Sequence, residues 1–177
     1  TKKKEEIGKL ATDYIENGDI IFIGASTTNE CLLKNIKNKR IRIITNSFYI
    51  FEQYKGNKNF ELILTGGAWR EKSGAFIGEI TDRILSEIKV DKSFIGANGI
   101  KDNNVTNSNK EEASLQEIIM KNSQKNYVLI DSNKFDLKDL YTFYPTDKID
   151  GIITDSRLNP NIKKKYEKYT KVINTFK

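Results

Sequence analysis

The chain has 177 residues, of which 37% are hydrophobic, and it carries a formal net charge of +6. The apolar residues come in blocks of strand or helix length, which excludes a disordered chain and indicates one domain with a substantial core. A single cysteine, Cys31, excludes an internal disulfide, and the lack of histidine argues against a zinc site, so we expect no metal and no cofactor.

The sequence shows neither a membrane segment nor a secretion signal. No apolar run is long enough to cross a bilayer, and no signal-peptide core follows the first residues, TKKKEE. We therefore expect a soluble, cytoplasmic protein without membrane contacts. Because the chain starts at Thr1 and enters a helical pattern at once, we also expect further sequence upstream. The basic charge is compatible with acidic partners, but it is spread along the chain and carries little weight.

Helix and strand patterns alternate along the chain. Apolar residues recur at helical spacing between Ile7 and Ile15, which predicts an amphipathic helix over residues 3–17. Further helices are predicted over residues 29–36, 47–54, 79–89, 111–122 and 160–169. Strands are predicted over residues 20–23, 41–44, 60–64, 90–95, 127–130, 151–154 and 171–173, with a weaker one over 141–144. Residues 68–77 and 98–109 are expected to be loops.

This alternation predicts the fold class. Strands that alternate with helices form βαβ units, and such units build a mostly parallel sheet with helices on both faces. In sheets of this kind, ligands bind in the crevice outside the carboxyl ends of the strands. The residues that follow each strand are therefore the first place to look for a binding site.

The first strand, residues 20–23, is followed by the small and hydroxyl-rich run Gly24–Thr28. A strand, a turn of small residues and a helix start together present free N–H groups and the positive end of a helix dipole, which suits a phosphate or another anion. An ordinary strand-to-helix turn, with Ser26 or Thr27 as the N-cap, explains the same residues equally well.

Small polar residues also follow the other strands. The six strand ends carry GASTT at 24–28, TNS at 45–47, TGG at 65–67, GANG at 96–99, DSNK at 131–134 and TDS at 154–156. Turn chemistry accounts for much of this pattern, but less well for the threonines and for the cation Lys134. Together the strand ends predict a crevice of hydroxyls, amides and N–H groups, with Lys134 and Arg70 as positive charges. Such a crevice suits a phosphorylated, polyhydroxylated small molecule.

The order of motifs resembles a known family. IFIGASTTNE, IITNSF, LILTGGAWR, DKSFIGANGI, KEEASL, VLIDSNKF and IDGIITD occur in the order and spacing of the C-terminal effector-sensing domain of DeoR-type bacterial transcriptional repressors. The resemblance covers roughly residues 5–174. It implies a fold similar to ribose-5-phosphate isomerase and glucosamine-6-phosphate deaminase.

The resemblance also implies a function. Residues 1–177 would form a single phosphosugar-sensing domain, and a winged helix-turn-helix DNA-binding domain would precede it in the full-length protein. A phosphorylated sugar effector would alter the affinity of the full-length protein for operator DNA at genes of sugar metabolism. The protein would be a homo-oligomer, and closure of the segment 98–109 or 68–77 over the effector would change how its subunits pair.

The resemblance and the strand ends together suggest the residues of the site. The phosphate-binding residues are expected to be Ser26, Thr27, Thr28 and Lys134. The sugar-binding residues are expected to be Thr45, Asn46, Ser47, Gly66, Gly67, Arg70, Asp91, Gly96, Asn98, Gly99, Glu112 and Asp131. The chain departs from the family pattern in two places, where Gly24 replaces an acid and Ser26 a glycine in the first turn, and where Gln116 replaces a lysine after the EA element.

A sugar-phosphate isomerase-like enzyme is the alternative. Such an enzyme needs a base and a group that stabilises the enediolate. The available groups are Glu112, Asp91, Asp131 and Lys134. Ordinary roles also explain the three carboxylates, because Glu112 stands at the start of a helix, Asp91 can cap a strand and Asp131 can form an Asx-turn. We therefore expect a sensor rather than an enzyme, with no catalytic residues. Direct nucleic-acid binding by this chain is a weaker alternative, because no recognition helix or aromatic RNA-binding motif is present.

Overall fold

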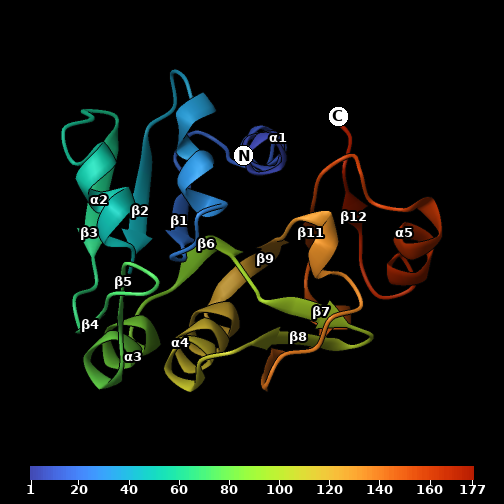
Figure 1. Ribbon diagram of the computed structural model, residues 1–177. Coiled ribbons are helices and arrows are strands. Elements are labelled where there is room, and N and C mark those ends of the chain that lie inside the picture. The colour runs from blue at the N-terminus through green and yellow to red at the C-terminus, as the bar shows by residue number, and fades with distance from the viewer.

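Strand β1 (Ile20–Ile23) lies near the middle of a seven-stranded parallel sheet in the computed structural model, which describes residues 1–177 (Figure 1). The strand order is β12-β11-β9-β6-β1-β2-β3, and every neighbouring pair is parallel. The remaining strands are β2 (Ile41–Thr45), β3 (Phe60–Leu64), β6 (Val90–Ile95), β9 (Ser123–Leu129), β11 (Gly151–Ile153) and β12 (Val172–Ile173). The predicted parallel sheet is confirmed.

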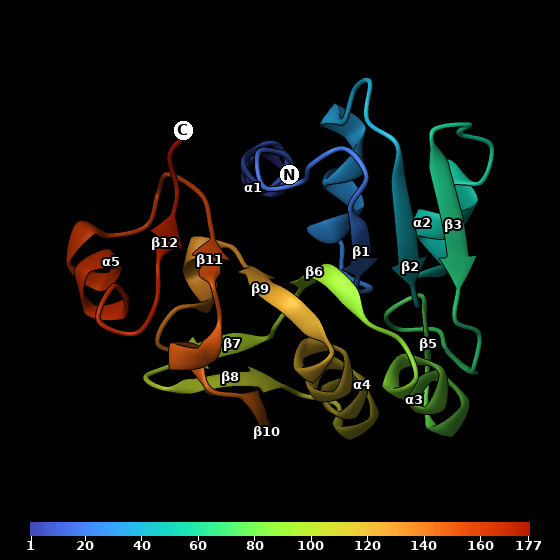
Figure 2. The same cartoon turned by 180° about the vertical axis from the view of Figure 1, so that it is seen from behind.

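Helices cover both faces of the sheet, because successive strand residues point to opposite sides. Ile21 and Ile23 pack in one core with α1 (Lys2–Thr12) and α2 (Phe48–Tyr54). Phe22 packs in the other core with α3 (Glu79–Ser86), α4 (Lys110–Lys121) and Tyr166 of α5 (Pro160–Tyr166). Figure 2 shows α3 and α4 side by side and far from α1, with α5 beside β12 at the end of the sheet opposite β3. None of these helices has the length and hydrophobicity needed to cross a lipid bilayer.

The expected helix over 29–36 is wrong. The chain forms two single 3-10 turns there, η1 (Asn29–Cys31) and η2 (Leu33–Asn35). Helix α1 lies directly against them, and the Thr12 hydroxyl donates a hydrogen bond of 3.3 Å to the carbonyl oxygen of Leu32. Tertiary contacts with α1 therefore override the local helical pattern, and they reduce the dipole expected at the end of β1 to that of single turns.

Both expected loops are instead β-hairpins. Residues 68–77 form β4 (Ala68–Arg70) and β5 (Ala75–Ile77), and residues 98–109 contain β7 (Gly99–Lys101) and β8 (Asn104–Asn107). The weak strand over 141–144 is β10 (Tyr141–Tyr144), which pairs antiparallel with β8. The sequence predicts these strands poorly because they are short and several of their residues are polar. They form because of their pairing partners, which lie on the same short hairpin or far away in the chain.

The direction in which successive strands are added to the sheet reverses at β1. The chain adds β2 and β3 on one side of β1 and then returns to place β6 on the other side. The carboxyl ends of β1 and β6 therefore diverge into a crevice at the topological switch point, where open α/β sheets bind ligands.

Candidate functional site

A cavity of about 400 Å³ opens at this switch point. Its walls come from the turn 24–28 after β1, residues 96–98 after β6, and residues 129–134 at the end of β9. Helix α4, the tip of the β4–β5 hairpin and Lys4 of α1 complete it. The strand ends that the sequence predicted to converge do so for β1, β6 and β9, and Asn46 adds the end of β2.

The turn after β1 is held by the side chains of Asn29, which the sequence did not single out, and of Asn46, which was expected to bind the sugar. Asn29 is fully buried, and its Nδ2 group donates to the carbonyl oxygens of Gly24 at 2.8 Å and Phe94 at 3.0 Å. Asn46 Oδ1 accepts the N–H of Ala25 at 3.0 Å. These bonds fix the turn between β1, β2 and β6 before any ligand arrives.

Three consecutive N–H groups of this turn have no partner within the chain. The hydroxyl oxygen of Ser26 accepts the N–H of Asn29 at 2.9 Å, so the capping role considered for Ser26 is present. The N–H groups of Ser26, Thr27 and Thr28 donate to no protein acceptor, and all three residues line the cavity. Successive free N–H groups in a fixed turn form a binding site for an anion.

Gly96 brings the end of β6 against this turn. A Cβ atom at position 96 would lie 2.9 Å from the Cβ of Ser26, which is closer than real side chains approach. The carbonyl oxygen of Gly96 accepts a hydrogen bond of 2.7 Å from Gln116 Nε2, and Gln116 Oε1 accepts another of 2.9 Å from Asn107. Gln116, which departs from the family pattern, thus supports the cavity floor through neutral hydrogen bonds.

Positive and negative side chains both line the cavity. The half-buried Lys134 makes no ion pair within the chain, and the Lys4 and Lys72 ammonium groups make none either. The carboxylates of the cavity wall are Glu30, Glu71, Glu112 and Asp131. Burial raises the pKa of the Glu30 carboxyl above its ordinary value, and the charges of Lys4 and Lys34 oppose this shift. No group of three or more His, Cys, Asp or Glu side chains could hold a metal ion.

Ser73, at the tip of the β4–β5 hairpin, provides a further unpartnered group. Its hydroxyl oxygen is buried and makes no hydrogen bond within the chain, although the residue lines the cavity. A buried hydroxyl without a partner costs free energy unless a ligand or water satisfies it. The hairpin tip therefore marks a position where a polar ligand group would gain a bond.

Several predicted sugar-binding residues lie in the cavity wall, and others do not. Asn46, Gly96, Asn98, Glu112 and Asp131 line it. Asn98 Oδ1 accepts the N–H of Ser108 at 2.9 Å, which leaves its Nδ2 group free. Asp131 Oδ1 accepts the N–H of Asn133 at 2.8 Å, so one carboxylate oxygen is used locally.

Thr45 and Ser47 are buried outside the cavity wall, and their hydroxyl groups form hydrogen bonds within the chain. The Thr45 hydroxyl donates to the carbonyl oxygen of Ile23 at 2.6 Å and accepts the N–H of Ser47 at 3.0 Å. The Ser47 hydroxyl caps α2 by accepting the N–H of Ile50 at 3.2 Å. Both residues shape the corner after β2, and both are buried away from the cavity wall.

Gly66 and Gly67 also serve the fold and not the cavity. Both have positive φ angles, 67° and 128°, and a Cβ atom at position 67 would lie 2.1 Å from the Thr81 hydroxyl. The pair lets the chain turn closely against α3. Gly99 is similarly placed, because a Cβ atom there would lie 2.2 Å from the carbonyl oxygen of Leu137.

Arg70 and Asp91 are the charged residues that the structure places elsewhere. Arg70 lies outside the cavity wall, with its Nε atom 3.8 Å from Glu112 Oε1. Asp91 lies at the amino end of β6 and accepts the N–H of Ile20 at 2.8 Å, so it faces the opposite edge of the sheet from the cavity. A strand-capping role, which the sequence left open for Asp91, matches this position.

The cavity contains residues that sequence reasoning missed. They are Lys4, Glu30, Tyr49, Glu71, Lys72, Ser73 and Asn107. Four of them, Lys4, Glu71, Lys72 and Ser73, lie on α1 or on the tip of the β4–β5 hairpin, outside the motifs that follow the strands. No local pattern singles them out, because Lys4 stands in a charge run typical of a solvated helix face.

Comparisons with known proteins identify the family of this chain. The family model of the DeoR C-terminal sensor domain matches residues 1–156. The chain belongs to this family. As a DeoR-family sensor domain, it is 36% identical over 176 residues to the lactose phosphotransferase system repressor of Lactococcus lactis subsp. lactis, and the match covers 98% of this chain and 69% of that repressor. The repressor of the same name from Streptococcus mutans is 34% identical over 175 residues, which cover 98% of this chain and 69% of that protein.

Solved structures show the same fold as this sensor domain. Ribose 5-phosphate isomerase A of Methanocaldococcus jannaschii aligns with a TM-score of 0.53 and 19% identity over 75% of this chain and 53% of that one. The eIF2B β subunit of Chaetomium thermophilum aligns with a TM-score of 0.59 and 16% identity over 95% of this chain and 53% of that one. The chain thus spans about half the length of these two proteins, and the likeness extends to the fold alone. The expected isomerase-like fold is confirmed.

Proposed function

We propose that this chain is the effector-sensing domain of a transcriptional repressor of sugar metabolism genes, and that its effector is a phosphorylated sugar. The observation that carries the proposal is the turn after β1, where the N–H groups of Ser26, Thr27 and Thr28 are unpartnered within the chain. These residues and Lys134, whose ammonium forms no ion pair, line the same cavity. Neutral donors together with an unpaired ammonium group suit a phosphate dianion.

The rest of the cavity suits the hydroxyl groups of a sugar. The free Nδ2 group of Asn98 is a donor, and the carboxylates of Glu112 and Asp131 are acceptors for hydroxyl groups. The buried Ser73 hydroxyl can both donate and accept. The names of the repressors from L. lactis and S. mutans, which refer to a lactose phosphotransferase system, add support for a phosphorylated sugar as the effector.

The geometry favours sensing over isomerisation. An isomerase requires a carboxylate or another base poised at the carbon that loses its proton. Glu112 lies near Arg70, at 3.8 Å, and one oxygen of Asp131 is used in a local turn. The proposed site therefore recognises the sugar phosphate without a positioned acid and base pair, and the relatives named as repressors support the same conclusion.

We further propose that the full-length protein binds operator DNA through a domain that precedes this one, and that it works as a homo-oligomer. The match to the L. lactis repressor covers 98% of this chain but only 69% of that protein, so the relative has substantial sequence outside the match. The sensor domain, residues 1–177, would bias the DNA affinity of the whole protein because the effector binds one arrangement of subunits better than another.

Calorimetric titration with four sugar phosphates tests the proposal. The probes are glucose 6-phosphate, galactose 6-phosphate, ribose 5-phosphate and sorbitol 6-phosphate, each compared with its unphosphorylated form. We expect saturable binding of at least one phosphorylated probe, at least tenfold tighter than its unphosphorylated form, and no isomerised product by NMR. Product formation would support the isomerase, and equal affinity for both forms would contradict a phosphate site.

A further inference from the structure

Helix α1 reaches the cavity through a single side chain. Lys4 lies in the first turn of α1, is partly buried, and lines the cavity together with Glu30 of η1. The Lys4 ammonium makes no hydrogen bond or ion pair within 4.0 Å, so its charge is not neutralised by direct contact. Its charge nevertheless acts on Glu30, because it lowers the pKa of that carboxyl against the raising effect of burial.

The same helix is pressed against the segment that follows the anion-binding turn. A Cβ atom at Gly8 would lie 2.6 Å from the carbonyl oxygen of Cys31, so α1 crosses η1 in backbone contact. The Thr12 hydroxyl donates to the carbonyl oxygens of Gly8 at 2.9 Å and Leu32 at 3.3 Å. A displacement of η1 therefore acts directly on α1.

The β4–β5 hairpin, which also borders the cavity, is tied down. Phe76 donates its N–H to the carbonyl oxygen of Asn46 at 2.8 Å, and Phe48 donates its N–H to that of Gly74 at 3.0 Å. Asn46 Nδ2 adds a bond of 3.0 Å to the carbonyl oxygen of Phe76. These bonds argue against the closure of residues 68–77 that the sequence suggested.

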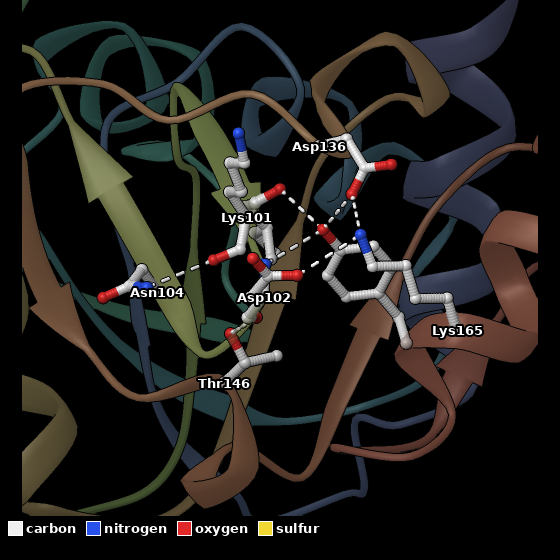
Figure 3. A network of polar contacts seen from close by, with 8 residues as sticks. Lys101, Asp102, Asn104, Asp136, Thr146 and Lys165 are labelled. Carbon is white, nitrogen blue, oxygen red and sulfur yellow. Dashed lines mark hydrogen bonds and ion pairs between the residues drawn. The ribbon is translucent and has the colours of Figure 1, made fainter.

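The β7–β8 hairpin is tied down as well (Figure 3). At its turn, the Asp102 carboxylate lies 3.2 Å from the Lys165 ammonium, which also donates to Asp136 at 2.8 Å. The Tyr166 hydroxyl accepts the N–H of Asp102 at 3.1 Å and donates to Asp136 at 2.6 Å, while the Thr146 hydroxyl donates to the carbonyl oxygen of Asp102 at 2.9 Å. This network joins the hairpin to α5 and argues against closure of residues 98–109.

We propose that Lys4 binds the phosphate of the effector and thereby couples the occupancy of the cavity to the position of α1. The proposal rests on the function proposed above. Lys4 and Glu30 line the same cavity, and the Lys4 charge acts on the Glu30 carboxyl without forming an ion pair with it. A phosphate dianion on the N–H groups of Ser26–Thr28 attracts Lys4 and repels Glu30, so the first turn of α1 moves toward the ligand and becomes more ordered.

This coupling has a direction that follows from the chain order. Helix α1 is the first element of this domain, so the proposed DNA-binding domain would be joined to it. Binding free energy spent on ordering α1 then changes the position of whatever precedes the helix. Effector binding is thus coupled to the rest of the protein through α1 and not through the closure of a loop.

Amide hydrogen exchange of residues 6–12 tests the coupling. The protein is measured empty and with the tightest binder among the four sugar phosphates above, at ten times its Kd. In the unchanged protein, we expect the ligand to slow exchange in α1 by about fivefold or more. In Lys4→Met, we expect affinity to fall by about fivefold to tenfold, since one charge-assisted contact is lost, and the slowing in α1 to disappear at the same tenfold excess.

Two further variants keep the test decisive. Lys9→Met removes an exposed charge from the same helix, and it should keep both the affinity and the slowing. Glu30→Gln removes the repulsion between this carboxylate and the phosphate, so it should tighten binding about fivefold. This variant also covers the case that Lys4→Met fails to fold.

The outcomes separate the two proposals. The coupling would be overturned if the ligand slowed amide exchange in α1 of Lys4→Met as much as in the unchanged protein. Weaker binding in Glu30→Gln would overturn it as well, and both outcomes would leave the sensor function intact. If none of the four sugar phosphates binds the unchanged protein, the proposed function itself fails, and the coupling fails with it.

Discussion

The two edges of the parallel sheet are both rich in polar residues, yet they differ in how these residues are satisfied. At the amino edge, Lys92 and Asp19 form a buried ion pair of 2.7 Å, and Asp91 accepts the N–H of Ile20 at 2.8 Å. At the carboxyl edge, three N–H groups, the Ser73 hydroxyl and the Lys134 ammonium have no partner within the chain.

Whether the polar groups already have partners identifies the ligand-binding edge of the sheet better than the number of polar residues does. Buried polar groups in folded proteins are nearly always hydrogen-bonded, so the unpartnered, buried Ser73 hydroxyl points to a polar group that completes it, and the free N–H groups and Lys134 line the same cavity. Polar groups that are paired with one another stabilise the fold and have no free donor or acceptor for a ligand. The amino edge is thus a structural edge, and the carboxyl edge is the proposed site.

Breaking the amino edge should have the largest effect on stability. Asp19→Ala leaves Lys92 buried, with its remaining acidic neighbour, Glu16, at 3.8 Å and mostly exposed. We expect the free energy of unfolding to fall by about 3–5 kcal/mol, because an uncompensated buried charge remains. Urea denaturation measures the loss. As a control, Glu61→Ala breaks the exposed pair with Arg42, and it should cost less than about 1 kcal/mol.

Breaking the carboxyl edge should instead affect binding. Lys134→Ala should weaken the binding of a sugar phosphate by about 10- to 100-fold, the equivalent of about 1.5–3 kcal/mol for a contact to a charged group, and leave the melting temperature of the empty protein nearly unchanged. Calorimetry and thermal unfolding measure the two quantities. Lys138→Ala, an exposed lysine nearby, is the control and should leave both unchanged. Unaltered affinity in Lys134→Ala would show that Lys134 does not bind the ligand and has a structural role instead.

Ser73→Ala should separate stability from binding. Removing a buried hydroxyl that has no partner should leave the free energy of unfolding unchanged or raise it by up to about 1 kcal/mol, and weaken sugar-phosphate binding by about fivefold. In the matched variant Ser114→Ala, the lost hydroxyl donates to Asp82 at 2.9 Å, so this change should cost about 1 kcal/mol of stability and leave binding unaltered. Chemical denaturation and calorimetry on both variants make the comparison, and a clear loss of stability in Ser73→Ala would contradict it.

Asp91→Asn should have the smallest effect of the four. The new amide oxygen can still accept the N–H of Ile20, so we expect a loss of about 0.5–1 kcal/mol in the free energy of unfolding. Affinity for the sugar phosphate should stay the same, because Asp91 lies at the edge away from the cavity. Weaker binding in this variant would return Asp91 to the site that the family resemblance suggested.

The sequence by itself determined the parallel sheet, its five α-helices and the turn after β1. Blocks of apolar residues such as Ile20–Ile23 are long enough to form strands buried on both faces, and this pattern is local. The small residues at 24–28 and 96–98 follow two such blocks, so the strand-end rule placed them together without a structure.

Only the tertiary structure decided which polar residues are free. Thr45, Ser47 and Gly67 look like site residues in sequence, but their partners Ile23, Ile50 and Thr81 lie on other elements or in a capped turn. Lys4 and Ser73 enter the cavity from α1 and from a hairpin whose polar strands carry no clear pattern. Strand and helix formation follows from the order of residues along the chain, whereas the satisfaction of a polar group depends on neighbours that the fold brings from far away.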